Sequence, residues 1–373
     1  MQKNRLNYVD TAKFIAIFVV IFCHAVSKGE LRHIGYSFHL PIFFILNGIT
    51  LKIYENQSFG DYLTRKLKSY LIPMFCLGVL LAFAEIFMSR LTSVNPLDVK
   101  HVGKMIISML EQKRVYPICF VGALLFSDVF FYFVVRWGKN KILPCAIFAC
   151  LFLAVAILCN KYYRYRYAWN IDVALFGVFF VFLGYAFSHE SFEKARTFLL
   201  KNRLISLLFG IGLFALGQVF GERNYHTYGL HLEMWAMCYD KVFLTLPCAI
   251  FSSFGIILFS NAISNRVFAN LGKTTLVLLA FHQIVTLPLF KMATADWYYQ
   301  IANLSGNDIR YVAYNLTATC ASVLVLVVVH YAIVYSPFAF ILNKKAPAFY
   351  KLQIQRLINK KQKNQEEVSD GAK

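Results

Sequence analysis

Long apolar runs separated by short polar stretches dominate this chain of 373 residues. A helix that crosses a membrane needs about 20 mostly apolar residues, and the pattern predicts ten such segments. They are residues 12–29, 36–54, 67–89, 117–135, 142–160, 171–188, 203–220, 242–261, 272–291 and 311–342. The last is long enough to tilt, kink or extend beyond the bilayer, and Pro41 and Gly48 interrupt the second. The pattern therefore predicts an all-α, polytopic membrane helix bundle of about ten transmembrane helices.

The composition supports this class. Hydrophobic residues make up 58% of the chain and charged residues only 15%, whereas soluble domains carry about 25% charged residues. An ordinary soluble enzyme and a disordered chain are both excluded, since disorder requires low hydrophobicity. The nine cysteines show no metal-ligand spacing, so we expect no metal site.

The distribution of basic residues predicts how the chain is oriented. The formal net charge is +19, from 38 lysines and arginines against 19 acidic residues. Most of the basic residues fall in segments on the same side as the N-terminus, so the positive-inside rule predicts that both termini lie in the cytoplasm. Residues 1–343 would form the membrane domain and residues 344–373 a basic, polar cytoplasmic tail. The partner that this charge indicates is the lipid bilayer, and we expect no nucleic acid.

The first predicted span carries the most specific signal. Lys13 and His24 are eleven residues apart, which on an α-helix places them about 20° from one common face and about 16 Å apart along the axis. Asp10 lies three residues before Lys13, within reach of an ion pair. Polar groups inside a bilayer are costly and often functional, although a single membrane histidine is also compatible with a hydrogen-bonded packing role.

The second and third predicted spans add further polar groups. His39 lies before Pro41 at the outer end of the second span, and the third span starts with a basic cluster of Arg65, Lys66 and Lys68. This cluster is explained either by topology alone or as a clamp for a phosphorylated cytosolic donor. Two acidic residues, Glu85 and Asp128, fall within predicted spans. They indicate either a proton or substrate path or pairing with a tyrosine or the backbone.

Five further residues are candidates for binding an acceptor on the outer side. Aromatic faces next to carboxylates and imidazoles suit sugars, although aromatic residues also form the belt at the membrane interface. The candidates are Trp169, Asp172, Tyr228, Glu233 and His282, of which His282 lies in the middle of a predicted span and is also compatible with a hydrogen-bonded structural role.

The order of these motifs resembles the membrane-bound acyltransferase-3 family over about residues 5–340, and within it the branch related to fucose 4-O-acetylases. Lys13 stands where the family often has Arg, and Asn47 where it usually has Ser. The matching stretches are Arg5, Asp10 and Lys13-x10-His24; Phe38-His39-Leu40-Pro41-x-Phe43-Phe44-x-x-Asn47-Gly48; Arg65-Lys66 to Pro73; Tyr116-Pro117 to Phe126; Trp169 to Tyr185; Asn224 to Gly229; and Leu271 to His282.

The resemblance implies an O-acyltransferase, an enzyme that transfers acyl groups other than aminoacyl groups. The donor would be acetyl-CoA from the cytosol, or a longer acyl thioester, used as a substrate with no permanently bound cofactor. The acceptor would be a hydroxyl of a surface polysaccharide or lipid-linked glycan, and the location a bacterial cytoplasmic (inner) membrane that the chain crosses many times. The resemblance makes no prediction of oligomeric state.

Residue chemistry can be set beside these implications. A sugar hydroxyl is a weak nucleophile that needs a base active near neutral pH, and a neutral imidazole fits. Phosphates of CoA need cations at the cytosolic side. The expected catalytic residues are His24, as general base or acyl relay, and His39. Donor binding is assigned to Lys13, Arg65, Lys66 and Lys68, and supporting roles to Asp10, Arg5 and Asn47.

Two other functions compete with this interpretation. A transporter or flippase of a lipid-linked saccharide would also have many spans and a polar lining, and in a scaffold protein the polar residues would serve packing alone. The Lys13–His24 pair with its basic rim favours the acyltransferase, since transporters more often show two related halves with broken helices, and no convincing internal repeat is present.

Overall fold

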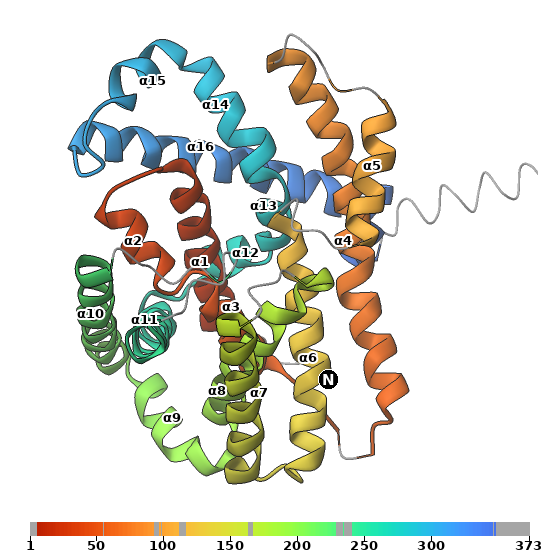
Figure 1. The fold of residues 1–373 in the computed structure, drawn as a ribbon, viewed down its shortest axis with the longest axis vertical. Helices are drawn as coiled ribbons and strands as arrows, with labels where there is room; N and C mark the ends of the chain where they lie inside the picture. The colour runs from red at the N-terminus through yellow and green to blue at the C-terminus, as the bar shows by residue number, and fades with distance from the viewer. Residues whose placement is uncertain are drawn as a thin grey trace, which may run out of the picture.

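The structure is a computed structural model that describes residues 6–54, 56–92, 97, 99–111, 117–162, 167–228, 234, 241–345 and 347. Every regular element within these ranges is a helix (Figure 1). The prediction of an all-α helix bundle is confirmed.

Nine segments of the described residues are long and apolar enough to cross a membrane. They correspond to nine of the ten predicted spans. They are α1 (Asn7–Ala25), α4 (Phe59–Thr92), η1 with α6 (Pro117–Cys119, Phe120–Trp137), α7 (Ile142–Tyr162), η2 with α8 (Ala168–Asn170, Ile171–Ser188), α10 (Arg203–Tyr228), α11 (Val242–Ile263), α13 with η4 and α14 (Thr275–Phe281, His282–Thr286, Leu287–Ala293) and α16 (Ile309–Val334).

The predicted span 36–54 differs from the other nine. Its regular part is α3, which covers only Pro41–Thr50 and follows the short helix α2 (Glu30–Tyr36). Ten residues extend about 15 Å, half of the roughly 30 Å hydrocarbon core. Because Pro41 lacks a backbone N–H and suits only the first turn of a helix, α3 starts there, so a full span in this segment is not confirmed.

Shorter helices connect and flank the spans. Pro337 ends the predicted span 311–342 early, since proline cannot continue a helix, and a short 3-10 segment follows α16. The remaining described elements are α5 (Val99–Leu110), η3 (Glu190–Phe192), α9 (Glu193–Lys201), α12 (Arg266–Gly272), α15 (Ala295–Ala302) and η5 (Pro337–Leu342). Almost all of the predicted tail 344–373 lies outside the described residues.

Helix α1 lies in the middle of the bundle (Figure 1). It contacts α2, α3, α11, α12, α13 and α16. Most of its apolar side chains are buried, including Ala12, Ala16 and Ile17, each without exposed surface. Small residues let neighbouring backbones approach closely, which drives helix association in membranes. The residues of α1 are therefore enclosed by helices from both halves of the sequence.

Helix α3 is held against α8 by two glycines. A Cβ on Gly48 would overlap the backbone oxygen of Val181, and a Cβ on Gly184 would overlap that of Ile45. The two backbones therefore touch at a distance that only glycine allows, and this contact fixes α3 against α8.

We expect Gly48→Ala to destabilise the fold by about 1–3 kcal/mol, because the added methyl group must displace backbone atoms that cannot move aside as a side chain would. The matched control is Gly212→Ala in α10, where an added Cβ meets no atom within 4 Å. The control should be neutral or slightly stabilising, since alanine favours helix more than glycine does. Thermal unfolding in detergent measures both, and equal midpoints for the two variants would contradict the close contact.

Candidate active site

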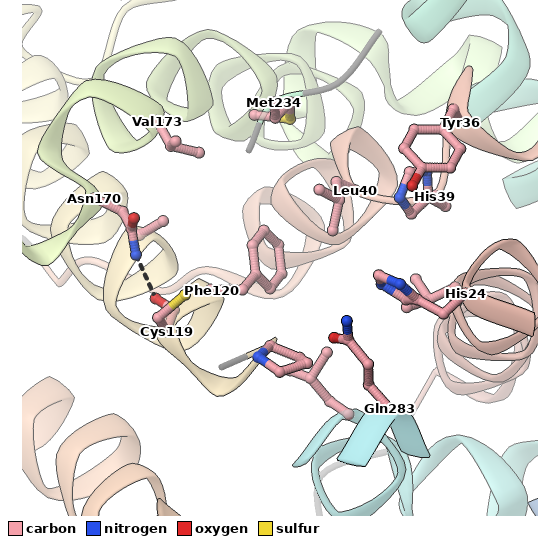
Figure 2. A pocket seen from close by; sticks show the side chains of 14 residues that line it. His24, Tyr36, His39, Leu40, Cys119, Phe120, Asn170, Val173, Met234 and Gln283 are labelled. Atoms are coloured by element: carbon pink, nitrogen blue, oxygen red, sulfur yellow. Dashed lines mark hydrogen bonds between the residues drawn. The ribbon is translucent and has the colours of Figure 1, made fainter. Parts of the chain in front are cut away.

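A cavity of about 380 Å³ lies beside the last turn of α1 (Figure 2). The His24 ring and the Gln283 amide point into it from neighbouring walls, while His39 and Tyr36 lie on an adjoining wall and Asn170 lies across the space. We call this space the histidine cavity. Its lining residues are Val20, His24, Tyr36, His39, Leu40, Pro117, Cys119, Phe120, Ala123, Asn170, Val173, Met234, Leu279 and Gln283.

His24 faces this cavity from the end of α1. The helix ends at Ala25, so His24 lies in its last turn, whereas a span over 12–29 would have placed it a turn deeper. Its ring centroid is 5.1 Å from that of His282, with 47° between the ring planes. Two imidazoles that are 258 residues apart in the sequence are thereby brought together, and His24 is the one of the two that lines the cavity.

His39 is buried with a defined ring orientation. Its Nδ1 lies 3.1 Å from the backbone oxygen of Gly35, and its ring contacts that of Tyr36 edge-on at 4.6 Å between centroids. A carbonyl oxygen can only accept, so Nδ1 carries the hydrogen and Nε2 is the accepting nitrogen of the neutral ring. The neutral side chain can therefore accept a proton or a hydrogen bond at Nε2.

A second cavity of about 320 Å³ lies further along the same helices. Two cations line it, Lys13 and Lys273, and we call it the lysine cavity. Phe120 and Leu279 line both cavities and therefore stand between them. The lining residues of the lysine cavity are Lys13, Ile17, Phe43, Asn47, Thr50, Ser69, Tyr70, Phe120, Val121, Leu124, Gly272, Lys273, Thr275, Leu276 and Leu279.

One face of α1 runs along both spaces. Lys13 and Ile17 line the lysine cavity, while Val20 and His24 line the histidine cavity. These positions follow helical periodicity, so the single stripe predicted for Lys13 and His24 is present. Eleven residues of helix separate the two side chains along the axis by about 16 Å.

Lys13 pairs with a carboxylate on its own helix. Its Nζ lies 3.7 Å from Oδ1 of the buried Asp10, the pair that the spacing predicts. The backbone of Asp10 also packs against Gly272, where a Cβ would overlap its carbonyl oxygen. This close approach of α12 to α1 brings Lys273 to the same cavity as Lys13. Arg5 lies outside the described residues.

The basic cluster of α4 does not line the lysine cavity. Arg65 donates to the backbone oxygen of Lys52 at 3.0 Å and lies over the rings of Tyr54 and Tyr62, and Lys68 is exposed. Lys66 forms an ion pair with the fully buried Asp128. Of the four residues assigned to donor binding, only Lys13 reaches this cavity.

Asp128 is the centre of a buried polar network. Besides Lys66, its carboxylate accepts from Asn47 at 2.7 Å and from the Tyr70 hydroxyl at 3.0 Å. Tyr62 donates to its backbone oxygen at 3.0 Å. A buried charge is tolerated only when it is paired and hydrogen-bonded, and this arrangement meets both conditions. Asp128 therefore pairs with other side chains, and it joins α3, α4 and α6 beside the lysine cavity.

We expect Asp128→Asn and Lys66→Met each to destabilise the fold by about 3–5 kcal/mol, because each leaves an uncompensated buried charge. The double variant should recover part of the loss, since no unpaired charge remains. Denaturation of the four proteins in detergent gives the coupling energy. Additive losses in the double variant would show that the pair is not coupled.

The structure describes the side chains of three of the five acceptor-side candidates, and none of the three lines the histidine cavity. Trp169 packs edge-on against Phe126 and Asp172 is buried, and neither lines the histidine cavity. His282 does not line this cavity either, and its ring contacts that of His24. For Tyr228 the structure describes the backbone only, and Glu233 lies outside the described residues.

The polar residues that line the cavities include three that were not among the candidates from the sequence. They are Asn170, Lys273 and Gln283. Asn170 follows Trp169 in left-handed backbone conformation, with φ of 51° and 61° respectively, and donates to the backbone oxygen of Cys119 at 2.9 Å. Strained backbone of this kind is often found at functional sites.

The signals for the other two were present but weak. Gln283 follows His282 directly, and Lys273 lies in the matched stretch 271–282. An adjacent residue on a regular helix points about 100° away, so Gln283 was not expected beside the histidines. Lys273 had counted only as a charge for topology.

The two cavities offer different chemical groups. The histidine cavity offers imidazoles and amides, which transfer protons and hydrogen-bond hydroxyl groups. The lysine cavity offers two ammonium groups, which bind phosphate. In the part of the chain that the structure describes, no group of three or more His, Cys, Asp or Glu side chains is placed to hold a metal ion.

These features define a multi-pass membrane protein with an internal site suited to acid–base chemistry. A family profile described as an acyltransferase domain matches residues 6–343, nearly the whole chain. The chain belongs to this acyltransferase family and is a membrane acyltransferase. No curated protein and no solved structure matches it.

Proposed function

We propose that the protein transfers an acetyl group from cytosolic acetyl-CoA to a hydroxyl of a surface polysaccharide or lipid-linked glycan. The observation that carries the proposal is the single face of α1 that joins a cationic cavity to a histidine cavity. The two substrates of such a reaction differ in the same way, since CoA is a polyanion and the acceptor is an uncharged hydroxyl.

The lysine cavity is assigned to the donor. Lys13 and Lys273 would bind the phosphates of CoA, and the apolar walls formed by Ile17, Leu124 and Leu276 suit the thin pantetheine arm. The positive-inside rule supports a cytosolic location for this end of the bundle, because the first helix begins there. Asn47 and Tyr70, held by Asp128, line the same cavity and would position the arm.

The histidine cavity is assigned to the acceptor. His24 would take the proton of the hydroxyl as its oxygen attacks the thioester carbon. The carbon–sulfur bond then breaks, and the CoA thiolate leaves and recovers a proton. The Gln283 amide faces the same space (Figure 2) and would donate to the oxyanion as it forms. Transfer through an acyl group on His24 would use the same geometry.

His39 and Asn170 would orient the acceptor. His39 presents an accepting nitrogen to a sugar hydroxyl, and Asn170 lies on the opposite wall. The aromatic rings of Tyr36 and Phe120 provide apolar faces of the kind on which sugars pack. The resemblance of the motif order over about residues 5–340 to the branch related to fucose 4-O-acetylases supports a sugar as acceptor and a bacterial inner membrane as location.

The test is direct transfer of label. Purified protein in liposomes would receive radiolabelled acetyl-CoA together with extracted lipid-linked glycans or soluble surface polysaccharide. We expect label in the glycan as a base-labile ester. A protein that moves lipid-linked glycans between leaflets, yet incorporates no label from any acceptor in the panel, would be a flippase, and the proposal would be wrong.

A further inference from the structure

The two ring nitrogens of His282 differ: Nδ1 is hydrogen-bonded, whereas Nε2 has no hydrogen-bond partner. Its Nδ1 lies 2.8 Å from the backbone oxygen of Leu278 and 3.0 Å from that of Leu279. Both oxygens can only accept, so the hydrogen of the neutral ring is on Nδ1 and the lone pair is on Nε2. This Nε2 is fully buried and has no hydrogen-bond partner. The nitrogen therefore needs a donor.

The His24 ring is placed to supply that donor. The centroid separation of 5.1 Å fits two imidazoles joined by an N–H···N hydrogen bond, which puts the centroids roughly 5 Å apart. A small rotation of the His24 ring, which faces the open cavity, would align its N–H with the lone pair of His282. His282 is enclosed on its other sides and cannot itself turn without losing its bonds to Leu278 and Leu279.

The irregular helix around His282 accounts for this placement. The backbone N–H of Leu287 bonds to the oxygen of His282, five residues earlier, which is the spacing of a π-helix. Pro288 follows and has no N–H to offer to the preceding turn. The wider turn allows His282 to lie buried against His24 while Gln283, the next residue, lines the cavity. Such π segments are frequent at functional sites.

We propose that His282 is a positioning residue for His24: its Nε2 accepts the N–H of the His24 ring, fixes one tautomer, and leaves the other His24 nitrogen as the base that faces the acceptor hydroxyl. A carboxylate often has this role in acyl-transfer sites. A neutral imidazole fixes the tautomer without placing a negative charge in a dry, apolar wall. This inference rests on the proposed function of His24 and deepens it.

Two substitutions separate positioning from packing. In His282→Gln the side-chain amide reaches the place of Nε2 and can accept from His24, but it gives up the bond to Leu278. In His282→Asn the shorter amide can keep the bond to Leu278, where it replaces Nδ1, but it offers no acceptor at the place of Nε2. The two variants are matched in size and polarity and differ in which half of the ring they replace.

We expect His282→Asn to lower kcat for label transfer from acetyl-CoA to extracted lipid-linked glycans by roughly 10- to 100-fold, part of what a general base contributes. KM for both substrates should stay within about twofold. His282→Gln should retain most of the wild-type kcat. In a His24→Ala background, His282→Asn should cause no further loss, because the two act as a unit. Unfolding midpoints recorded alongside show whether each variant is folded.

The opposite order of the two variants would overturn the proposal, since activity would then follow the bond to Leu278. Equal kcat values for Gln and Asn, whether high or low, would overturn it as well, because the acceptor would not matter. These outcomes differ from a failure of the proposed function, in which the wild-type protein itself transfers no label. If wild type transfers label and His24→Ala does not, a wild-type rate in His282→Asn refutes only the positioning role.

Discussion

Replacing His24 with alanine is expected to lower the turnover number for acyl transfer by roughly 100- to 10,000-fold, the range that a positioned general base provides. KM for acetyl-CoA should change little, because Lys13, which is assigned to the donor, lies about 16 Å away along α1. Steady-state kinetics with radiolabelled acetyl-CoA in liposomes measures both values.

The matched control is His226→Ala in α10. His226 is an exposed histidine that pairs with Glu222 at 2.9 Å and does not line the histidine cavity, so its loss should leave turnover unchanged. If His24→Ala kept wild-type turnover with an intact fold, the assignment of the base would be wrong, and His39 would be the next candidate.

Removing the charge of Lys13 or Lys273 is expected to raise KM for acetyl-CoA. A hydrogen bond to a charged group contributes about 1.5–3 kcal/mol, so Lys13→Met and Lys273→Met should each lower kcat/KM for the donor by roughly 10- to 100-fold. Lys13→Arg should keep most of the activity, since the charge is retained. Kinetics at varied acetyl-CoA, with the acceptor saturating, measures the effect.

Lys68→Met is the control for this pair of lysines. Lys68 has the same charge and lies on α4, but it is exposed and does not line the lysine cavity. We expect its KM for acetyl-CoA to match the wild type. A larger effect at Lys68 than at Lys273 would place the donor at the surface of α4, as the basic cluster in the sequence had suggested.

The sequence alone predicted the parts of the site that depend on local periodicity. Lys13 and His24 are on one helix, and the 3.6-residue repeat relates them without any knowledge of the rest of the fold. The apolar runs likewise predicted nine of the spans, because the length of a membrane helix is set by the bilayer. The segment 36–54 was not confirmed as a span, because its regular helix begins only at Pro41 and covers ten residues, although its hydropathy is that of a span.

The remaining parts depend on contacts between distant segments. Lys66 was assigned to the donor on the basis of its charge alone. Its partner Asp128 is 62 residues away in the sequence, so the pairing could not be predicted from the local pattern. His282 joins His24 through the packing of α13 and η4 on α1. Gln283 reaches the cavity through an irregular turn, and a helical repeat assumes regular turns. No single-segment pattern contains this information.

The position of Phe120 and Leu279 between the two cavities matters for the cell as well as for the reaction. In the proposed function, the two cavities that they separate receive water-soluble groups from opposite sides of the membrane, so an open passage between them would conduct protons and ions. Apolar constrictions exclude water and thereby stop conduction. The two side chains would therefore block the flow of ions and still let the thin pantetheine arm with its acyl group pass. A wider passage would let ions leak down the membrane potential. This leakage would limit the width of the passage, and hence the size of the acyl group that can pass through it.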